Sequence, residues 1–233
     1  MNNIDILKKL LTPYDVGHTK IRIGPQHDGG YVVSKTLLAK TDAVYSLGVG
    51  TECGFDLELA QAGLPIYMFE SSHPSPPLTH PNFFYTQAFV NSEVLERAVI
   101  SNSHISSNLL LAMDIEGGEY SLLSAISDEF LFKFKQISFE VHDVLNNPSL
   151  ISILEKLNNH YILIHIHANN NCIRPGAFSS GIVDGVPNVL ELTYVHRSEV
   201  SNDPTISSVG SPIKDLDFKN QQDLPDVELN WWL

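Results

Sequence analysis

The chain has 233 residues, 43% of them hydrophobic, and its 14 basic and 27 acidic residues give a formal net charge of −13. This length is enough for one sizeable core, so we expect a single domain over residues 1–197 and a polar tail over 198–233. An acidic chain without clustered Lys and Arg does not suit the phosphate backbone of nucleic acids. No stretch approaches the roughly 18 consecutive apolar residues of a membrane span, and the first residues contain no apolar signal core. Two cysteines, Cys53 and Cys172, make no disulfide framework, so we expect a cytoplasmic protein.

The first forty residues carry a helix pattern and a hairpin pattern. Apolar residues within 4–12 fall on one helical face, and Pro13 ends that helix. Residues 19–24 and 31–34 are rich in β-forming side chains and flank the turn 25–30, which predicts two short strands.

Beyond residue 40, apolar runs alternate with amphipathic segments. In chain order we expect a strand at 42–49, a helix at 54–63 with Gly63 as its C-cap, strands at 64–70 and 83–90, a helix at 91–99, a strand at 108–116, a helix at 118–126, a strand at 136–143, a helix at 150–159, a strand at 161–170, a loop at 169–187 and a strand at 188–197. This alternation predicts an α/β fold with a mainly parallel sheet covered by helices on both faces.

Polar and charged residues gather where the predicted strands end. Ligands of parallel α/β sheets bind at the carboxyl ends of the strands, so this convergence is the main functional signal in the sequence. The residues in question are Gly48, Gly50, Glu70, Asp114, Glu140, His142, His167 and Asn169.

A glycine turn and an acidic residue twenty positions later predict a nucleoside site. Gly48 and Gly50 allow close approach of the backbone to a ligand. The third glycine of a dinucleotide fingerprint is replaced by Cys53, which weakens an NAD interpretation. Glu70 lies at the end of the next strand, where a carboxylate accepts hydrogen bonds from ribose hydroxyls. The alternative is a plain tight turn beside a surface glutamate.

Six segments together resemble the class I S-adenosylmethionine-dependent methyltransferases, and within them the FkbM-type O-methyltransferases of sugars and polyketides. These segments are IRIGPQHDGGYVV, YSLGVGTECGFD, PIYMFE, LLLAMDIEGGEYSLL, ISFEVHD and HIHANNN, within residues 20 to 197. The resemblance implies a Rossmann-like, seven-stranded, mostly parallel sheet whose last strand pair is antiparallel.

The resemblance also implies an S-adenosylmethionine site. Gly48 and Gly50 are expected to border the cofactor, Glu70 to hold its ribose and Ser71 to lie near the adenine. Ser46 stands where the class often has an acidic residue at the methionine end. Two further elements are expected at the cofactor: Asp28, Gly29 and Gly30, within a capping segment 1–40, and Asp114, facing the methyl donor.

The carboxylates and histidines allow two ways of activating an acceptor hydroxyl. In one, Asp114, Glu140 and His167 hold Mg²⁺ or Mn²⁺ and His142 is the general base. In the other, His167 is the base and Asp114 or Glu140 orients it. Glu116 and Glu119 are read mainly as helix N-terminal acids.

The loop 169–187 is long enough to be a lid or binding loop at the mouth of the site. Asn169 and Asn170 are expected to bind sugar hydroxyls, and Arg174 to bind the phosphate of a nucleotide-linked sugar. Glu191 in a predicted buried strand needs a polar partner or solvent.

The leading hypothesis is therefore an S-adenosylmethionine-dependent O-methyltransferase of a sugar or nucleotide-linked sugar. An NAD-dependent sugar oxidoreductase or epimerase is disfavoured by Cys53 and by the lack of a Y-x-x-x-K pair, since Ser124 follows Tyr120 at the fourth position. A non-catalytic binding domain is the third alternative. The sequence leaves a homo-oligomer open.

Overall fold

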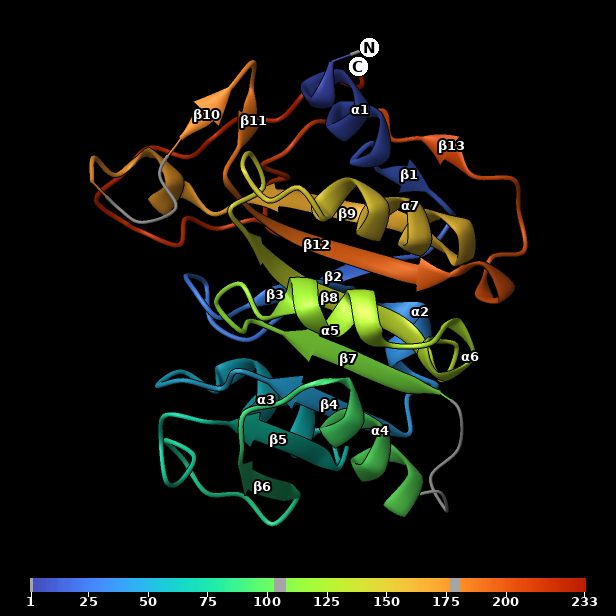
Figure 1. Ribbon diagram of the computed structural model, residues 1–233, viewed down its shortest axis with the longest axis vertical. Coiled ribbons are helices and arrows are strands. Elements are labelled where there is room, and N and C mark those ends of the chain that lie inside the picture. Colours follow the sequence, from blue (N-terminus) through green and yellow to red (C-terminus); the bar gives the residue numbers. More distant parts are fainter. Residues whose placement is uncertain (1, 103–107, 177–180) are drawn as a thin grey trace.

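A seven-stranded sheet runs through the centre of the computed structural model, which describes residues 2–102, 108–176 and 181–233 (Figure 1). Its strand order is β6-β5-β4-β7-β8-β12-β9. The strands are β4 (Ala43–Leu47), β5 (Ile66–Glu70), β6 (Phe83–Gln87), β7 (Leu109–Met113), β8 (Phe134–His142), β9 (Tyr161–Ala168) and β12 (Val189–His196).

The predicted Rossmann-like fold with an antiparallel last strand is confirmed. Strands β4 to β8 pair in parallel, whereas β12 runs antiparallel to both β8 and β9. The chain moves outward from β4 to β6, returns to β7 on the other side of β4, and then continues through β8. The strand order thus reverses beside β4, which opens a crevice between the carboxyl ends of β4 and β7.

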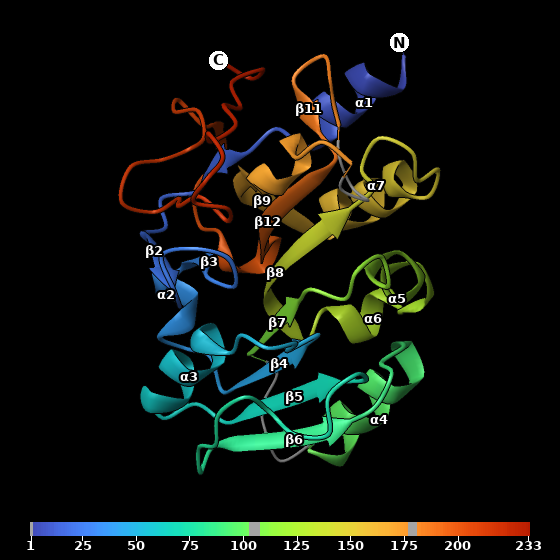
Figure 2. The ribbon, with the colours of Figure 1, turned by 90° about the vertical axis from the view of Figure 1, so that its left-hand side faces the viewer.

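Helices cover both faces of the sheet, as the sequence predicts (Figures 1 and 2). The larger core cluster joins the sheet to α1 (Asn3–Leu10), α4 (Ser92–Ser101), α5 (Glu119–Ala125), α6 (Asp128–Leu131) and α7 (Leu150–His160). On the opposite face α3 (Gly54–Gln61) packs with the hairpin of β2 (Lys20–Ile23) and β3 (Tyr31–Ser34), beside which lies α2 (Lys35–Leu38). The predicted glycine C-cap is present, because Gly63 follows the cap residue Ala62 with a φ of 98°.

The short elements were not predicted from the sequence. Four residues are too few for a periodic pattern, so α2 and α6 depend on the side chains of Ser34 and Ser127, each of which caps its helix. Within the predicted loop 169–187, the structure adds a 3₁₀ turn (Asn170–Ile173) and the hairpin of β10 (Ile182–Val183) and β11 (Val186–Pro187), while residues 177–180 lie outside the described residues. A second 3₁₀ turn spans Arg197–Glu199.

The segment 198–233 wraps around the β9 end of the sheet (Figure 2). Its strand β13 (Thr205–Ile206) pairs with β1 (Tyr14–Asp15) near the N-terminus. Ser211 and Leu229 form a backbone bridge within it, and the Trp231 indole donates a hydrogen bond to the Lys8 carbonyl at 3.1 Å. Trp231 therefore docks this segment on α1, whereas the Trp232 indole donates to the Val209 carbonyl within the segment.

None of the helices in the described ranges combines the length and the hydropathy that a bilayer crossing requires.

Gly48 lies where the ends of β4 and β7 approach each other closely. It has a φ of 81°, and a Cβ added there would lie 1.7 Å from the Asp114 carbonyl oxygen. The glycine is thus required by the chain itself, because β4 and β7 meet at this point. Gly50, with a φ of 56°, has no atom within 4 Å of the added Cβ in the described structure, so it leaves room for a ligand.

We expect Gly48→Ala to destabilise the protein by at least about 3 kcal/mol, because positive-φ strain adds to a clash with backbone. Gly63→Ala is the matched control: its φ is 98° but no described atom lies within 4 Å, so we expect about 1 kcal/mol. Urea unfolding of both variants measures the difference. Equal losses would show that the contact with Asp114 is unimportant.

Candidate functional site

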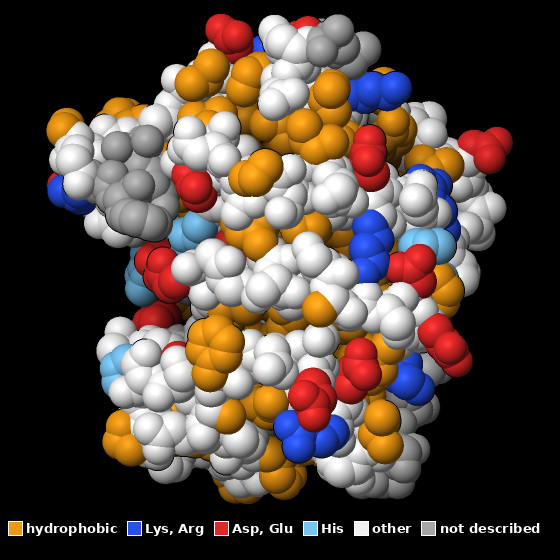
Figure 3. All heavy atoms as spheres, viewed as in Figure 1, with side chains coloured by type: hydrophobic (Ala, Val, Ile, Leu, Met, Phe, Trp, Pro, Cys, Tyr) orange, Lys and Arg blue, Asp and Glu red, His pale blue; other side chains and the backbone are white. Residues whose placement is uncertain are grey.

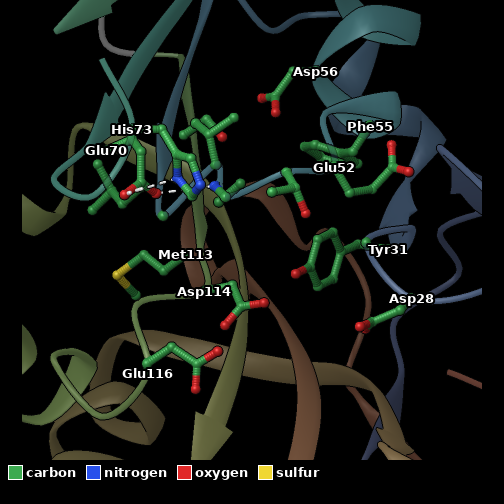
Figure 4. Close-up of a pocket in the computed structure, with 18 of the residues that line it drawn as sticks. Asp28, Tyr31, Glu52, Phe55, Asp56, Glu70, His73, Met113, Asp114 and Glu116 are labelled. Atoms are coloured by element: carbon green, nitrogen blue, oxygen red, sulfur yellow. Dashed lines mark hydrogen bonds and ion pairs between the residues drawn. The ribbon is translucent and has the colours of Figure 1, made fainter. Parts of the chain in front are cut away.

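A cavity of about 350 Å³ opens at the carboxyl ends of β4, β5 and β7 (Figure 4). In Figure 3 acidic side chains gather in a hollow on the left-hand side, toward which the parallel strands of Figure 1 run. Six carboxylates line the cavity, and among its described lining residues there is no Lys or Arg: Asp28, Glu52, Asp56, Glu70, Asp114 and Glu116. The site therefore favours a cationic ligand over an anionic one.

Glu70 is held as a carboxylate at the end of β5. Its side chain accepts hydrogen bonds from the Gly50 N–H at 2.9 Å and the Ser72 N–H at 2.5 Å. Burial opposes ionisation, but these backbone hydrogen bonds hold the pKa of Glu70 below its usual value. A carboxylate has about four lone-pair sites, so Glu70 can also accept a hydrogen bond from a hydroxyl of a bound ligand.

The first turn of α3 is already supplied with negative charge. Glu52 accepts a hydrogen bond from the Gly54 N–H at 2.6 Å, and Asp56 lies within the same turn. In dinucleotide folds this helix N-terminus binds the pyrophosphate. Here the Glu52 carboxylate occupies that position, so a phosphate would meet like charge.

Not all of the other residues that the sequence predicts to contact the cofactor line the cavity. Asp28, Gly29 and Ser46 line it, whereas Ser71 lines an adjoining pocket of about 330 Å³. Gly30 has a role in the hairpin: a Cβ there would lie 2.3 Å from the Pro25 carbonyl oxygen.

His142 lies at the centre of a cluster of carboxylates at the end of β8. Its Nε2 lies 3.2 Å from Glu140, 3.5 Å from Glu116 and 3.8 Å from Asp114, and its Nδ1 lies 3.3 Å from Glu119. Glu116 reaches this position in a left-handed backbone conformation, with a φ of 52°. Glu119 is therefore more than a helix N-terminal acid, because it fixes the ring of His142.

These contacts set the protonation of the cluster. Burial lowers the pKa of His142, but hydrogen bonds to Glu119 and Glu140 and the charges of Glu140 and Asp114 raise it more, to about 11. Burial, with the charge of Glu140 next, raises the pKa of Asp114 well above its usual value. The Asp114 Oδ1 atom is buried and has no hydrogen-bond partner among the described residues.

Asp114, Glu140 and His142 can hold a cation together, since one ligand atom from each lies within 4.8 Å of the others. His167, the third predicted metal ligand, is not brought to this group. It is fully buried on β9, with Nδ1 3.2 Å from Glu191 and Nε2 3.3 Å from Asp226. Burial lowers the pKa of His167, but these hydrogen bonds raise it more, to about 10, so it is not a free base.

Glu191 has the polar partners that its position in a buried strand requires. It faces Glu140 across β8 and β12, and the Asn220 amide donates a 2.6 Å hydrogen bond to it. The same amide donates to Asp28 at 3.0 Å, so Asn220 joins the segment 198–233 to the edge of the cavity.

The residues predicted to bind the acceptor are engaged within the protein. Asn169 donates to Glu140 at 3.1 Å. The fully buried Asn170 amide donates to the Gln221 and Pro225 carbonyls. Arg174 pairs with Asp223 at 3.0 Å. Asn170 and Arg174 thus anchor the segment 198–233, and none of the three is among the described residues that line the cavity.

Sequence reasoning missed four acids and amides that complete the site: Asp56, Asp217, Asn220 and Asp226. Three of them come from the polar segment 198–233, where no local pattern marks a residue as buried. Only an indirect signal in the sequence points to these residues: His165 and His167 in β9 and Glu191 in β12 are polar residues in buried strands and therefore need polar partners.

Comparison with protein-family models gives no match, and comparison with curated proteins gives none. Among solved structures, the chain is similar to a candidate DNA modification methyltransferase encoded within an E. coli prophage, with 12% identity and a TM-score of 0.44 over 69% of this chain and 48% of that one. It is also similar to precorrin-6y C5,15-methyltransferase from Geobacter metallireducens, with 11% identity and a TM-score of 0.37 over 70% of this chain and 87% of that one. A third similar structure is WbdD, with 13% identity and a TM-score of 0.40 over 76% of this chain and 41% of that one. The chain thus spans about half the length of the first of these. With TM-scores below 0.5, these similarities carry no argument about activity.

We expect Asp217→Asn to destabilise the protein by roughly 3 kcal/mol at neutral pH, because it breaks a buried pair with His165, whose Nε2 lies 2.7 Å from Asp217. Burial raises the pKa of Asp217, but the charge and hydrogen bond of His165 outweigh it, so the pKa falls to about 2. Because the pKa of Asp217 is lower in the folded protein than in the unfolded chain, its carboxylate stabilises the fold above about pH 4. This stabilisation is lost as the pH falls through about 2.

The gap between wild type and variant should therefore shrink from pH 6 to pH 3 in urea unfolding. Asp223→Asn is the control, because its pair with Arg174 is largely exposed and should be worth less than about 1 kcal/mol. A gap that stays constant over this range would show that the Asp217 carboxylate does not carry the effect.

Proposed function

We propose that this protein is an S-adenosylmethionine-dependent methyltransferase. The observation that carries the proposal is the acidic cavity at the reversal of the strand order, with Glu70 ionised at one wall and no Lys or Arg among its described lining residues. S-adenosylmethionine is an adenosine that carries a sulfonium and an ammonium group, and it has no phosphate. Its charge and its ribose both match this cavity.

The residues that line the two pockets support this proposal. Glu70 would accept hydrogen bonds from the ribose hydroxyls, and Gly50 leaves room beside it. The adjoining pocket, lined by Phe69, Ser71 and Phe89, would take the adenine. Asp114 lines both pockets and would lie near the sulfonium of a cofactor bound in this way. The bound cofactor supplies an electrophilic methyl group for in-line transfer.

We propose a sugar hydroxyl as the acceptor, in line with the FkbM-type resemblance of the sequence. An uncharged sugar suits the site better than a nucleotide-linked one, because the carboxylates would repel a diphosphate and Arg174 pairs with Asp223. Asp28 and Glu116 line the open part of the cavity and would accept hydrogen bonds from sugar hydroxyls.

We propose that the acceptor hydroxyl is activated at Asp114, Glu140 and His142. The His142 Nε2 atom lies 3.2 Å from Glu140 Oε1 and 3.8 Å from Asp114 Oδ1, a spacing that suits ligands of one divalent cation. Asp114 Oδ1 has no hydrogen-bond partner among the described residues. A divalent cation would have to replace the Nε2 proton of His142, and Glu119 would then hold Nδ1 so that Nε2 faces the cation, as carboxylates do in many histidine–metal sites. Mg²⁺ or Mn²⁺ bound there would lower the pKa of the hydroxyl.

Asp114 is the residue that would receive the hydroxyl proton if the site works without a cation. Its pKa is raised by burial and by Glu140, which brings the carboxylate closer to the basicity that proton transfer near neutral pH requires. His142 and His167 do not suit this role because their surrounding carboxylates keep them protonated.

Calorimetric titration should show binding of S-adenosylhomocysteine and no binding of NAD or NADP. Glu70→Gln should weaken S-adenosylhomocysteine binding about tenfold, because the ribose loses a charged acceptor. Glu155→Gln, an exposed change on α7, is the matched control and should bind like wild type. Binding of NAD without S-adenosylhomocysteine would replace this proposal with the oxidoreductase alternative.

Electron paramagnetic resonance should detect Mn²⁺ bound to the wild-type protein. Asp114→Asn should weaken that binding at least about tenfold, because it removes one of the charged ligands. Asp203→Asn, an exposed carboxylate of the segment 198–233, should leave it unchanged. Absence of Mn²⁺ binding at millimolar concentration would remove the cation and leave Asp114 as the proton acceptor.

A further inference from the structure

Asp56 is a buried carboxylate that the contacts within the protein leave incomplete. It lies in the first turn of α3, is 4% exposed and lines the acidic cavity (Figure 4). Its Oδ1 atom is buried without a hydrogen-bond partner in the described ranges. The hydroxyl of Ser46, at the end of β4, hydrogen-bonds the carboxylate from the strand side.

A structural role does not account for these features. An acid in the first turn of a helix is stabilising at the surface, but burial removes the water that a carboxylate needs. The nearby Glu52 adds like charge rather than relief, and with burial as the main cause the pKa of Asp56 is raised to about 7. No described Lys or Arg reaches the cavity to pair with it. The position therefore lacks a cation.

The location of Asp56 defines which cation would fit. Ser46, Gly48 and Gly50 line the same cavity. Figure 4 shows Glu70 at a different wall from Asp56. A ligand with its ribose at Glu70 and its sulfonium near Asp114 would extend its amino-acid end along this turn. Ser46 itself stands at the strand end where class I enzymes often have an acid.

We infer that Asp56 binds the α-ammonium group of the cofactor's amino-acid end, so that a carboxylate from α3, oriented by Ser46, replaces the acid missing from the end of β4. This inference rests on the proposed function. It makes Asp56 a determinant of affinity and of selectivity for ligands with a free amino group.

A double-mutant cycle with two ligands tests the inference. The ligands are S-adenosylhomocysteine and its 4-thiobutyrate analogue, which keeps the adenosine and the carboxylate but lacks the α-amino group. Calorimetry gives dissociation constants of both for wild type and Asp56→Asn, a change that preserves side-chain shape. Asp203→Asn serves as the control for loss of one negative charge.

Wild type should prefer S-adenosylhomocysteine by about 10- to 100-fold, the range for a charge-assisted hydrogen bond, and Asp56→Asn should lose that preference. Binding of the deaminated analogue should be unchanged in Asp56→Asn, which also shows that the variant is folded. Should Asp56→Asn not fold, Asp56→Ser replaces it in the cycle.

Three results would overturn the inference in distinguishable ways. If wild type binds both ligands equally, no group in the protein recognises the ammonium, whatever the variants do. If Asp56→Asn weakens both ligands to the same extent, Asp56 acts through the shape of the cavity. If wild type binds neither ligand, the proposed function fails and the inference fails with it.

Discussion

Carboxylates buried side by side at the carboxyl edge of the sheet impose the constraint on which this structure depends. Glu140 and Glu191 face each other across β8 and β12, each at most 6% exposed. Isolated buried charges are strongly unfavourable, so each must be paired, protonated or hydrogen-bonded. His142 balances Glu140, and His167 balances Glu191. Amide groups of Asn169 and Asn220 occupy further lone pairs.

The same requirement explains why a polar segment folds back over the protein. His165 and His167 lie on one side of β9, and Asp217 and Asp226 of that segment are their partners. Without the segment, His167 would keep only Glu191, and neither ring nitrogen of His165 would have a partner among the described residues. The segment also has apolar contacts: Val227 and Leu229 are buried in the larger core, and Trp231 and Trp232 pack against it. Polar and apolar contacts together therefore position residues 211–229.

The sheet could be predicted because each strand carries an apolar run bounded by turn or charged residues, and because the antiparallel last strand pair follows from the family resemblance. Local pattern also placed Asp114, Glu140 and His142 at neighbouring strand ends. It could not decide that His142, rather than His167, lies beside Asp114, since that depends on which strands are adjacent and on β12 entering between β8 and β9. Arg174 and Asn170 were assigned to a ligand because their partners lie about fifty residues away in sequence. Asp56 was not singled out, because the burial of a single carboxylate does not change the hydrophobic periodicity of a helix.

The anchoring of β9 by residues 217–226 has a consequence for the order of events during synthesis. Strands β4 to β9 and β12 leave the ribosome before those residues do, and domains fold as their chain emerges. Sheet pairing can therefore precede completion of the charge balance around His165 and His167. Until residues 217–226 have emerged, His165 lacks Asp217, His167 lacks Asp226 and Glu191 lacks Asn220, so the charge balance at this edge of the sheet depends on a segment made after every strand of the sheet.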